Sequence, residues 1–130
     1  MTFVDTNYFL RFLLQDITSQ HLQAKQLFLD AANNKLHLFT SLVVIFEIYW
    51  VLSSFYKKDK AAIGKILTDI LKMSFIEFEN IRILKPAIEI YQKNNLDLED
   101  AYNLTFAKHH KSDYFKTFDT QLSRLYEKTP

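Results

Sequence analysis

The sequence of 130 residues contains no cysteine and only one glycine, Gly64. Without cysteine there can be no disulfide, no catalytic thiolate and no zinc site built on thiolates. A loop that cradles a phosphate needs several glycines at fixed spacing, because its backbone N–H groups must come close to the ligand. The lone glycine therefore argues strongly against a P-loop NTPase and against a conventional dinucleotide-binding domain.

Long apolar runs and an excess of one charge are also missing. The formal net charge is +1, so any contact with nucleic acid must come from a local patch. No uninterrupted apolar segment approaches the roughly 20 residues that span a bilayer, and the short segment Tyr8–Leu14 is preceded by Asp5 rather than by the basic residues of a secretory signal. We expect a cytoplasmic protein with no membrane partner, and the lack of cysteine permits a reducing compartment.

The chain has the size and apolar content of one domain. A length of 130 residues suits one hydrophobic core, and hydrophobic residues make up 48% of the sequence. There is no linker, low-complexity segment or internal repeat. We predict a single domain over residues 1–130.

Short β-branched or aromatic segments alternate with longer segments of helical periodicity. The predicted strands are Met1–Val4, Leu36–Phe39, Phe75–Phe78 and Tyr114–Thr117. The predicted helices are Thr6–Leu14, Ser19–Asn33, Ser41–Lys57, Asp59–Met73, Ile81–Lys93, Leu98–His110 and Thr120–Tyr126. This alternation predicts an α/β domain with a parallel sheet of four strands, flanked by helices. A fifth strand near the C-terminus is left open.

Glu47 is the only charged residue in the apolar segment Leu42–Leu52. In a helix, the residues one turn before and after it are all apolar. A carboxylate among apolar side chains must be neutralised, hydrogen-bonded or bound to a cation. The segment contains no basic residue, so the partner must come from elsewhere in the fold. A metal ion is a natural candidate, and a distant Lys or Arg is the alternative.

Three other acids lie at predicted strand ends or helix starts. Asp5 ends the first strand, Asp119 follows the fourth, and Asp100 lies in the first turn of the sixth helix. Ligands of open parallel sheets bind outside the carboxyl ends of the strands, so Asp5 and Asp119 would meet there if their strands are neighbours. Four carboxylates share a small space only with cations, and oxygen ligands alone suit Mg²⁺ or Mn²⁺.

Each of these three acids also has an ordinary structural interpretation. Asp5 and Asp119 could simply be N-caps of the helices that follow them. Asp100 could be a first-turn acid that faces the helix dipole, with Asp97 as the N-cap. The metal-site hypothesis therefore depends on all four acids together.

Four motifs occur in order at Phe3–Arg11, Ser41–Glu47, Leu98–Leu104 and Thr117–Leu122. This ordered set resembles the PIN-domain ribonucleases, and most closely the small VapC-type toxins of toxin–antitoxin pairs. The resemblance covers nearly the whole chain. It implies a three-layer PIN-like fold with a central parallel sheet of four or five strands, in which the first and fourth strands are neighbours.

The resemblance also implies roles for individual residues. The metal ligands would be Asp5, Glu47 and Asp100, with Asp119 either as a ligand or as an acid just outside the ligand set; polar support would come from Thr6, Asn7 and Thr117. Arg11, one helical turn past Asn7, is close enough to the expected site to contact an RNA phosphate. The family often has a glycine after the sixth helix, where this chain has Lys111, which must tolerate the helix-terminating conformation or end the helix in another way.

The function expected from these residues is endoribonuclease activity that depends on Mg²⁺ or Mn²⁺. Such an ion would polarise the scissile phosphate of RNA and activate a water molecule. One alternative is a receiver-type phosphoryl-transfer domain, although Lys128 comes too late to be its phosphate-contacting lysine. Another is a non-catalytic PIN-fold module that binds RNA or protein.

Partners are expected from the apolar helices and from the resemblance. The predicted helices Ser41–Lys57 and Asp59–Met73 carry more apolar surface than a small domain can easily bury, which favours a homodimer. The resemblance adds a cognate antitoxin whose tail would present Arg or Lys to the acidic pocket.

Overall fold

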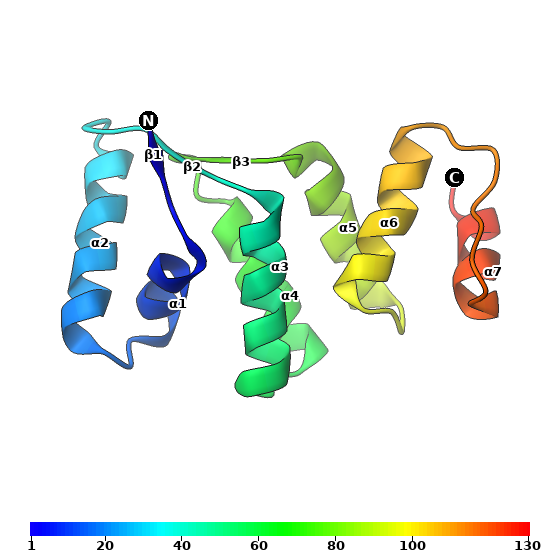
Figure 1. Cartoon of the computed structure of the whole chain (residues 1–130), viewed down its shortest axis with the longest axis horizontal. Helices are drawn as coiled ribbons and strands as arrows, with labels where there is room; N and C mark the ends of the chain where they lie inside the picture. Colours follow the sequence, from blue (N-terminus) through cyan, green and yellow to red (C-terminus); the bar gives the residue numbers. More distant parts are fainter. The chain divides into compact units, whose positions relative to one another are not determined.

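The computed structural model describes residues 1–130 (Figure 1). It divides into two compact units, Met1–Glu79 and Asn80–Pro130, and each is described by itself. The single domain expected over the whole chain stays a prediction. No helix in the structure combines the length and the apolar character needed to cross a bilayer.

The first unit contains a parallel sheet of three short strands in the order β1-β2-β3. The strands are β1 (Thr2–Phe3), β2 (Leu38–Thr40) and β3 (Ile76–Phe78). In the register, Thr2 lies opposite Leu38, and Leu38 lies opposite Ile76. Because the strands are parallel, their carboxyl ends meet at one edge, where Val4 and Asp5, Ser41 and Glu79 follow them.

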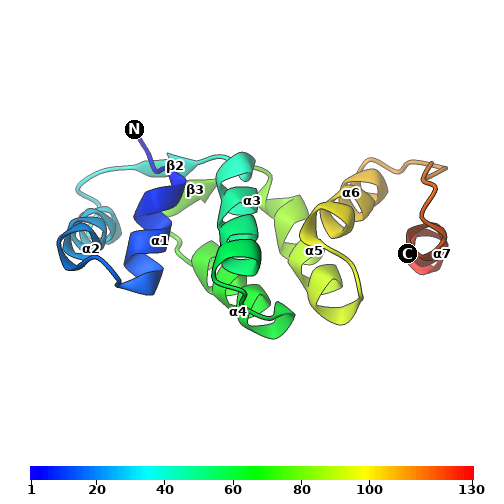
Figure 2. The ribbon, with the colours of Figure 1, turned by 60° about the horizontal axis from the view of Figure 1, so that its bottom comes forward.

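Four helices and one π-helical segment complete the first unit. They are α1 (Thr6–Leu14), α2 (Thr18–Ala32), α3 (Leu42–Trp50), η1 (Val51–Phe55) and α4 (Lys60–Leu71). Side chains cap the starts of α3 and α4: Ser41 Oγ accepts from Val44 N at 3.3 Å, and Asp59 Oδ1 accepts from Ala62 N at 2.8 Å. Figure 2 shows α1 and α3 side by side next to the strands, and the two helices are in contact. Fully buried side chains of β2, α3, η1 and α4 form the core, among them Leu38, Ile48, Leu52 and Ile70.

The second unit is helical and consists of α5 (Ile81–Lys93), α6 (Leu98–His109) and α7 (Thr120–Lys128). Helix α6 packs against both of the others. Its C-cap is His110, and the next residue, Lys111, has a left-handed φ of 57°. Lys111 N donates to Lys108 O and Ser112 N donates to Ala107 O, both at 3.0 Å, which is the Schellman arrangement that usually carries glycine. Of the two alternatives left open for Lys111, the structure shows the first: this residue adopts the helix-terminating conformation.

The prediction of a fourth strand at Tyr114–Thr117 is wrong, and there is no fifth strand. The side chain of Tyr114 is 74% exposed. Phe115 instead stacks on Tyr126 of α7, with ring centroids 5.0 Å apart, and the Tyr126 hydroxyl donates to the carbonyl of Ser112. The segment is thus held by α7 rather than by a ladder of backbone hydrogen bonds. Because this strand does not form, its expected pairing with the first strand is also wrong.

Candidate active site

The candidate site begins at the end of β1, where both the backbone N–H and the carbonyl of Val4 are hydrogen-bonded. Val4 N donates to Phe39 O at 3.0 Å, and Val4 O accepts from the buried hydroxyl of Thr40 at 2.7 Å. These bonds tie the residue before Asp5 to β2. The backbone position of Asp5 is therefore set by the sheet.

Asp5 occupies the N-cap position of α1 with extended backbone angles, φ −86° and ψ 166°. Its side chain is exposed and makes no capping hydrogen bond. The ordinary capping role is thus not filled by this carboxylate, in contrast to Asp59 at the start of α4. The Asp5 oxygens are available to a ligand.

The next residue, Thr6, connects the start of α1 to α3. Its side chain is buried, and its Oγ1 donates to Glu47 Oε2 at 3.0 Å. This bond holds the Glu47 carboxylate beside the first turn of α1, immediately after Asp5. The first unit therefore brings two of the four predicted acids to the same end of one helix.

The expectation that Glu47 is enclosed by apolar side chains is wrong. The Glu47 side chain is exposed, on the same face of α3 as the exposed Val43 and Trp50. Nearly every residue of α3 is apolar, so periodicity could not show which side faces the core. The ion pairs of the structure do not include Glu47, so the alternative of a salt bridge to a distant Lys or Arg is not formed.

Two supporting residues at this edge were missed by the sequence analysis. Thr40 fixes Val4, as described above, and Glu79 Oε1 accepts from Leu42 N at 2.8 Å at the start of α3. Both follow the pattern of polar residues at the carboxyl ends of β2 and β3. That position was the available signal, but Glu79 had no motif to single it out.

Arg11 does not lie free beside the acids. Its Nη1 donates to both carboxylate oxygens of Asp16 at 2.6 and 2.7 Å, and Tyr56 Oη donates to Asp16 Oδ2 at 3.4 Å. The hydrogen bond from Arg11 lowers the pKa of Asp16, and the same bond raises the pKa of Arg11. A phosphate that binds Arg11 must therefore compete with Asp16.

In the second unit, Asp100 lies in an acidic group at the start of α6. Asp97 is the N-cap, and its Oδ1 accepts from Asp100 N at 2.8 Å. Partial burial raises the pKa of Asp100, and the charges of Asp97 and Asp119 raise it further. Burial and the neighbouring Asp97 likewise raise the pKa of Glu99. The ionised form of Asp100 is thus disfavoured by its surroundings.

Asp119 has the capping role that was its alternative interpretation. Its Oδ1 accepts from Leu122 N at 3.1 Å at the start of α7. Thr117 Oγ1 accepts from Asp119 N at 3.1 Å, which fixes the backbone of that cap. The cap uses one oxygen of the Asp119 carboxylate. The negative charge of Asp119 still raises the pKa of Asp100.

The donor set suits a hard divalent cation, because it consists of carboxylate and hydroxyl oxygens. Asp5 and Glu47 are linked through Thr6 in the first unit, and Asp100 and Asp119 interact electrostatically in the second. Within either unit, no three Asp, Glu or His side chains gather closely enough to hold an ion. The convergence of all four acids stays a prediction.

A parallel sheet with acids after the carboxyl ends of β1 and β3 is an α/β arrangement, and ligands of such sheets bind at that edge. The family model of the PIN domain matches residues 2–128, so the chain belongs to the PIN-domain family. PIN domains are typically metal-dependent nucleases. No curated protein and no solved structure matches this chain.

Proposed function

We propose that this PIN-domain protein is an endoribonuclease that depends on Mg²⁺ or Mn²⁺. The observation that carries the proposal is the hydrogen bond from Thr6 to Glu47 beside an Asp5 carboxylate that caps nothing. Asp5, Glu47, Asp100 and Asp119 would supply oxygen ligands, the donors that these ions prefer. Asn7 and Thr117 would support them.

The residues of the chain prepare the site for a cation and for RNA. Thr6 donates to Oε2 of Glu47, and this bond restricts the orientation of the carboxylate. The like charges around Asp100 would be relieved by a cation. When bound, a divalent ion lowers the pKa of a water molecule and stabilises charge on the scissile phosphate. No nucleophile from the protein is required, which agrees with the absence of cysteine.

The proposal is tested by cleavage of single-stranded RNA with Mg²⁺, with Mn²⁺ and with a chelator. Glu47→Gln should abolish cleavage with an unchanged or higher melting temperature, because the amide keeps the shape and removes a charge. Glu89→Gln is the matched control, since Glu89 is also an exposed glutamate on a helix. Cleavage that persists in Glu47→Gln, or that is indifferent to the chelator, would refute the metal-dependent mechanism.

Metal binding itself gives a second readout. An ion that binds only the folded state adds about 2.7 kcal/mol of stability at 100 times its dissociation constant. The melting temperature should rise with Mg²⁺ or Mn²⁺, and Asp5→Asn should blunt the rise. An equal rise in wild type and Asp5→Asn would count against Asp5 as a ligand.

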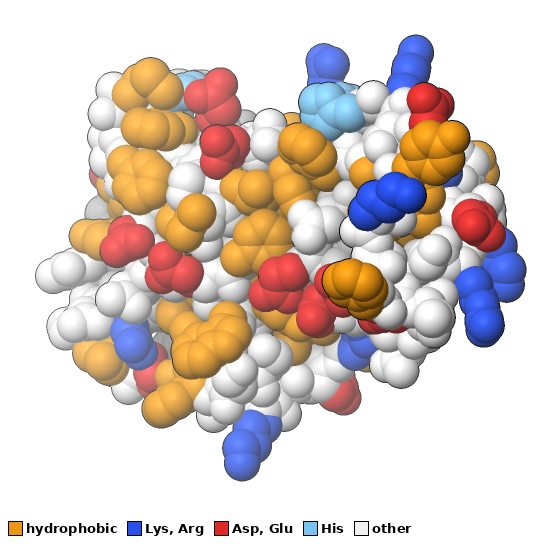
Figure 3. All heavy atoms as spheres, turned by 45° about the vertical axis from the view of Figure 1, so that its right-hand side comes forward, with side chains coloured by type: hydrophobic (Ala, Val, Ile, Leu, Met, Phe, Trp, Pro, Cys, Tyr) orange, Lys and Arg blue, Asp and Glu red, His pale blue; other side chains and the backbone are white.

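The proposal extends to a cytoplasmic toxin of the VapC type, acting as a homodimer and held by an antitoxin. It is supported by the exposed apolar side chains of Val43, Trp50 and Phe55, which are 63%, 62% and 75% exposed on α3 and η1. Figure 3 shows that hydrophobic side chains reach the surface beside acidic ones. A single-copy mass in light scattering at micromolar concentration would refute the dimer. The antitoxin proposal is tested by adding the protein encoded by the gene beside this one. RNA cleavage that is undiminished by that protein would refute the proposal that it is the antitoxin.

A further inference from the structure

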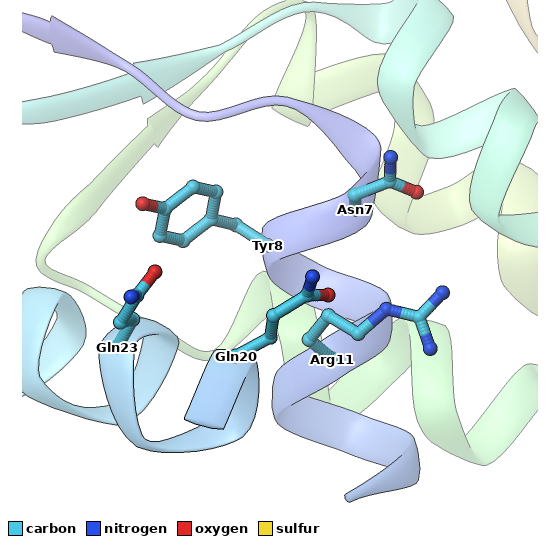
Figure 4. A pocket seen from close by; sticks show the side chains of 5 residues that line it. All are labelled: Asn7, Tyr8, Arg11, Gln20 and Gln23. Carbon is cyan, nitrogen blue, oxygen red and sulfur yellow. The ribbon is translucent and has the colours of Figure 1, made fainter. Parts of the chain in front are cut away.

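A hollow of about 250 Å³ lies between α1 and α2 in the first unit. It is lined by Asn7, Tyr8 and Arg11 of α1 and by Gln20 and Gln23 of α2 (Figure 4). Spacings of three and four residues place the α1 side chains on neighbouring positions of the helix surface. The first lining residue, Asn7, comes two residues after Asp5 in the sequence, in the first turn of α1.

The lining combines an aromatic ring with primary amides and one cation. Tyr8 is 40% exposed, and Figure 4 shows its ring extending from α1 on the side of Gln23. Each amide of Asn7, Gln20 and Gln23 presents donors beside an acceptor. None of the lining residues is acidic, and the one charged residue among them, Arg11, is a cation whose guanidinium bonds the Asp16 carboxylate.

This chemistry matches one unpaired nucleobase with its phosphate. Single-stranded RNA is recognised by stacking of splayed bases on aromatic side chains and by hydrogen bonds to their edges. Amide side chains can bond base edges in pairs of donor and acceptor. The volume is below the roughly 300–1,000 Å³ of pockets for drug-sized ligands, which suits one base rather than several.

We propose that this hollow binds a single base of the RNA substrate, next to the phosphodiester bond at the acidic edge. The inference rests on the proposed ribonuclease function and names a binding site for its substrate. Tyr8 stacks on the base, Gln20 and Gln23 bond its edge, and Arg11 contacts an adjoining phosphate. Asn7 links the hollow to the residues around Asp5.

Asp16 sets the availability of Arg11 in this site. The Arg11 guanidinium is held by Asp16, which is itself 40% exposed, and Tyr56 adds a bond to the same carboxylate. RNA must displace this exposed ion pair, which is weak in water. Asp16→Asn should therefore strengthen RNA binding, whereas a purely structural pair would leave it unchanged.

The test measures fluorescence anisotropy of a short labelled single-stranded RNA in excess chelator, so that binding is separated from cleavage. Tyr8→Ala should weaken binding about tenfold, the usual effect of losing a stacked base. Gln23→Ala should also weaken it, and Arg11→Gln should flatten its salt dependence. The controls on α2 are Leu22→Ala, an exposed apolar side chain, and Gln26→Ala, whose amide donates to Asp30.

The outcomes separate this inference from the proposed function. Weaker binding in Tyr8→Ala and Gln23→Ala, with both controls unchanged and duplex RNA a poor competitor, supports the base site. Unchanged RNA binding in Tyr8→Ala overturns the base site. The same conclusion holds if Tyr8→Ala binds RNA normally but loses the binding of a protein partner. Wild-type protein that binds RNA through Tyr8 but cleaves none would overturn only the ribonuclease proposal. Cleavage that is lost in Glu47→Gln but indifferent to Tyr8→Ala would overturn only the base site.

Discussion

Thr6 and Glu47 lie 41 residues apart in the chain, yet the Thr6 hydroxyl meets the Glu47 carboxylate at 3.0 Å. The donor is buried and the acceptor side chain is exposed. A buried hydroxyl needs a partner, and Glu47 supplies it from the adjacent helix. The bond therefore serves the fold at Thr6 and orients the acid at Glu47.

Replacing Thr6 by valine keeps the shape and removes this hydrogen bond. We expect kcat for RNA cleavage to fall about tenfold, which corresponds to a loss of about 1.4 kcal/mol of transition-state stabilisation. Stability should change by less than about 1 kcal/mol, because water can solvate the exposed Glu47. Thr68→Val is the control, since the Thr68 hydroxyl bonds Gly64 O within α4. Equal kcat values in the two variants would show that Thr6 does not position Glu47.

Asp5 and Asp59 occupy the same position at the start of a helix but differ in what their carboxylates do. Asp59 caps α4, so Asp59→Ala should cost about 1 kcal/mol of unfolding free energy and leave cleavage intact. Asp5→Ala should abolish cleavage with no comparable loss of stability, because no cap is lost. Urea unfolding and RNA cleavage of both variants check this. A similar loss of stability in both would restore the capping role of Asp5.

Asp100 should make the protein less stable as the pH rises. Its pKa is raised in the folded state by burial and by Asp97 and Asp119, whereas in the unfolded chain it titrates near the ordinary value of about 3.9. The folded state thus holds the proton longer, and stability falls as the pH rises from about 4 through the folded pKa.

Asp100→Asn should therefore raise the unfolding free energy at pH 7 without divalent metal. The gain should vanish below about pH 4, where wild-type Asp100 is protonated in both states. Urea unfolding at the two pH values measures the difference. Asp113→Asn, an exposed loop acid, is the control, and a gain for Asp100→Asn that is independent of pH would contradict the electrostatic cause.

Lys111 holds a left-handed conformation that glycine adopts without strain. For a residue with a β-carbon this costs roughly 1–2 kcal/mol, partly offset by the greater freedom of an unfolded glycine, about 0.4–1 kcal/mol. Lys111→Gly should raise the unfolding free energy by about 0.5–1 kcal/mol. Lys72→Gly should instead lower it, because Lys72 ends α4 with φ −79°. Thermal melting of the two variants should shift in opposite directions.

Much of the fold was predictable from local patterns. The bounds of α1 and α5 agree with the predicted helices, because the apolar spacing and polar boundaries at Thr6 and Asn80 are clear. The first three strands were found to within two residues. The fourth failed because Tyr114–Thr117 has the composition of a strand, while the contact that decides its structure is the stacking of Phe115 on Tyr126.

The candidate site was predictable in its residue types but not in its environments. Motif order indicated Asp5 and Glu47, and the structure links them through Thr6. The exposure of Glu47 could not be foreseen, since a helix that is apolar nearly all round gives no sign of which side is buried. The Arg11–Asp16 ion pair was also missed, because it depends on how the chain turns after α1.

The brevity of β1 bears on how this chain meets others of its kind. At two residues, β1 is the shorter of the two edge strands of the sheet and offers very few unpaired backbone groups to a foreign strand. Long, flat edges nucleate aggregates by strand addition, and very short ones do not. Even at high concentration the protein should resist cross-β aggregation through this edge, so self-association must use side-chain surfaces instead.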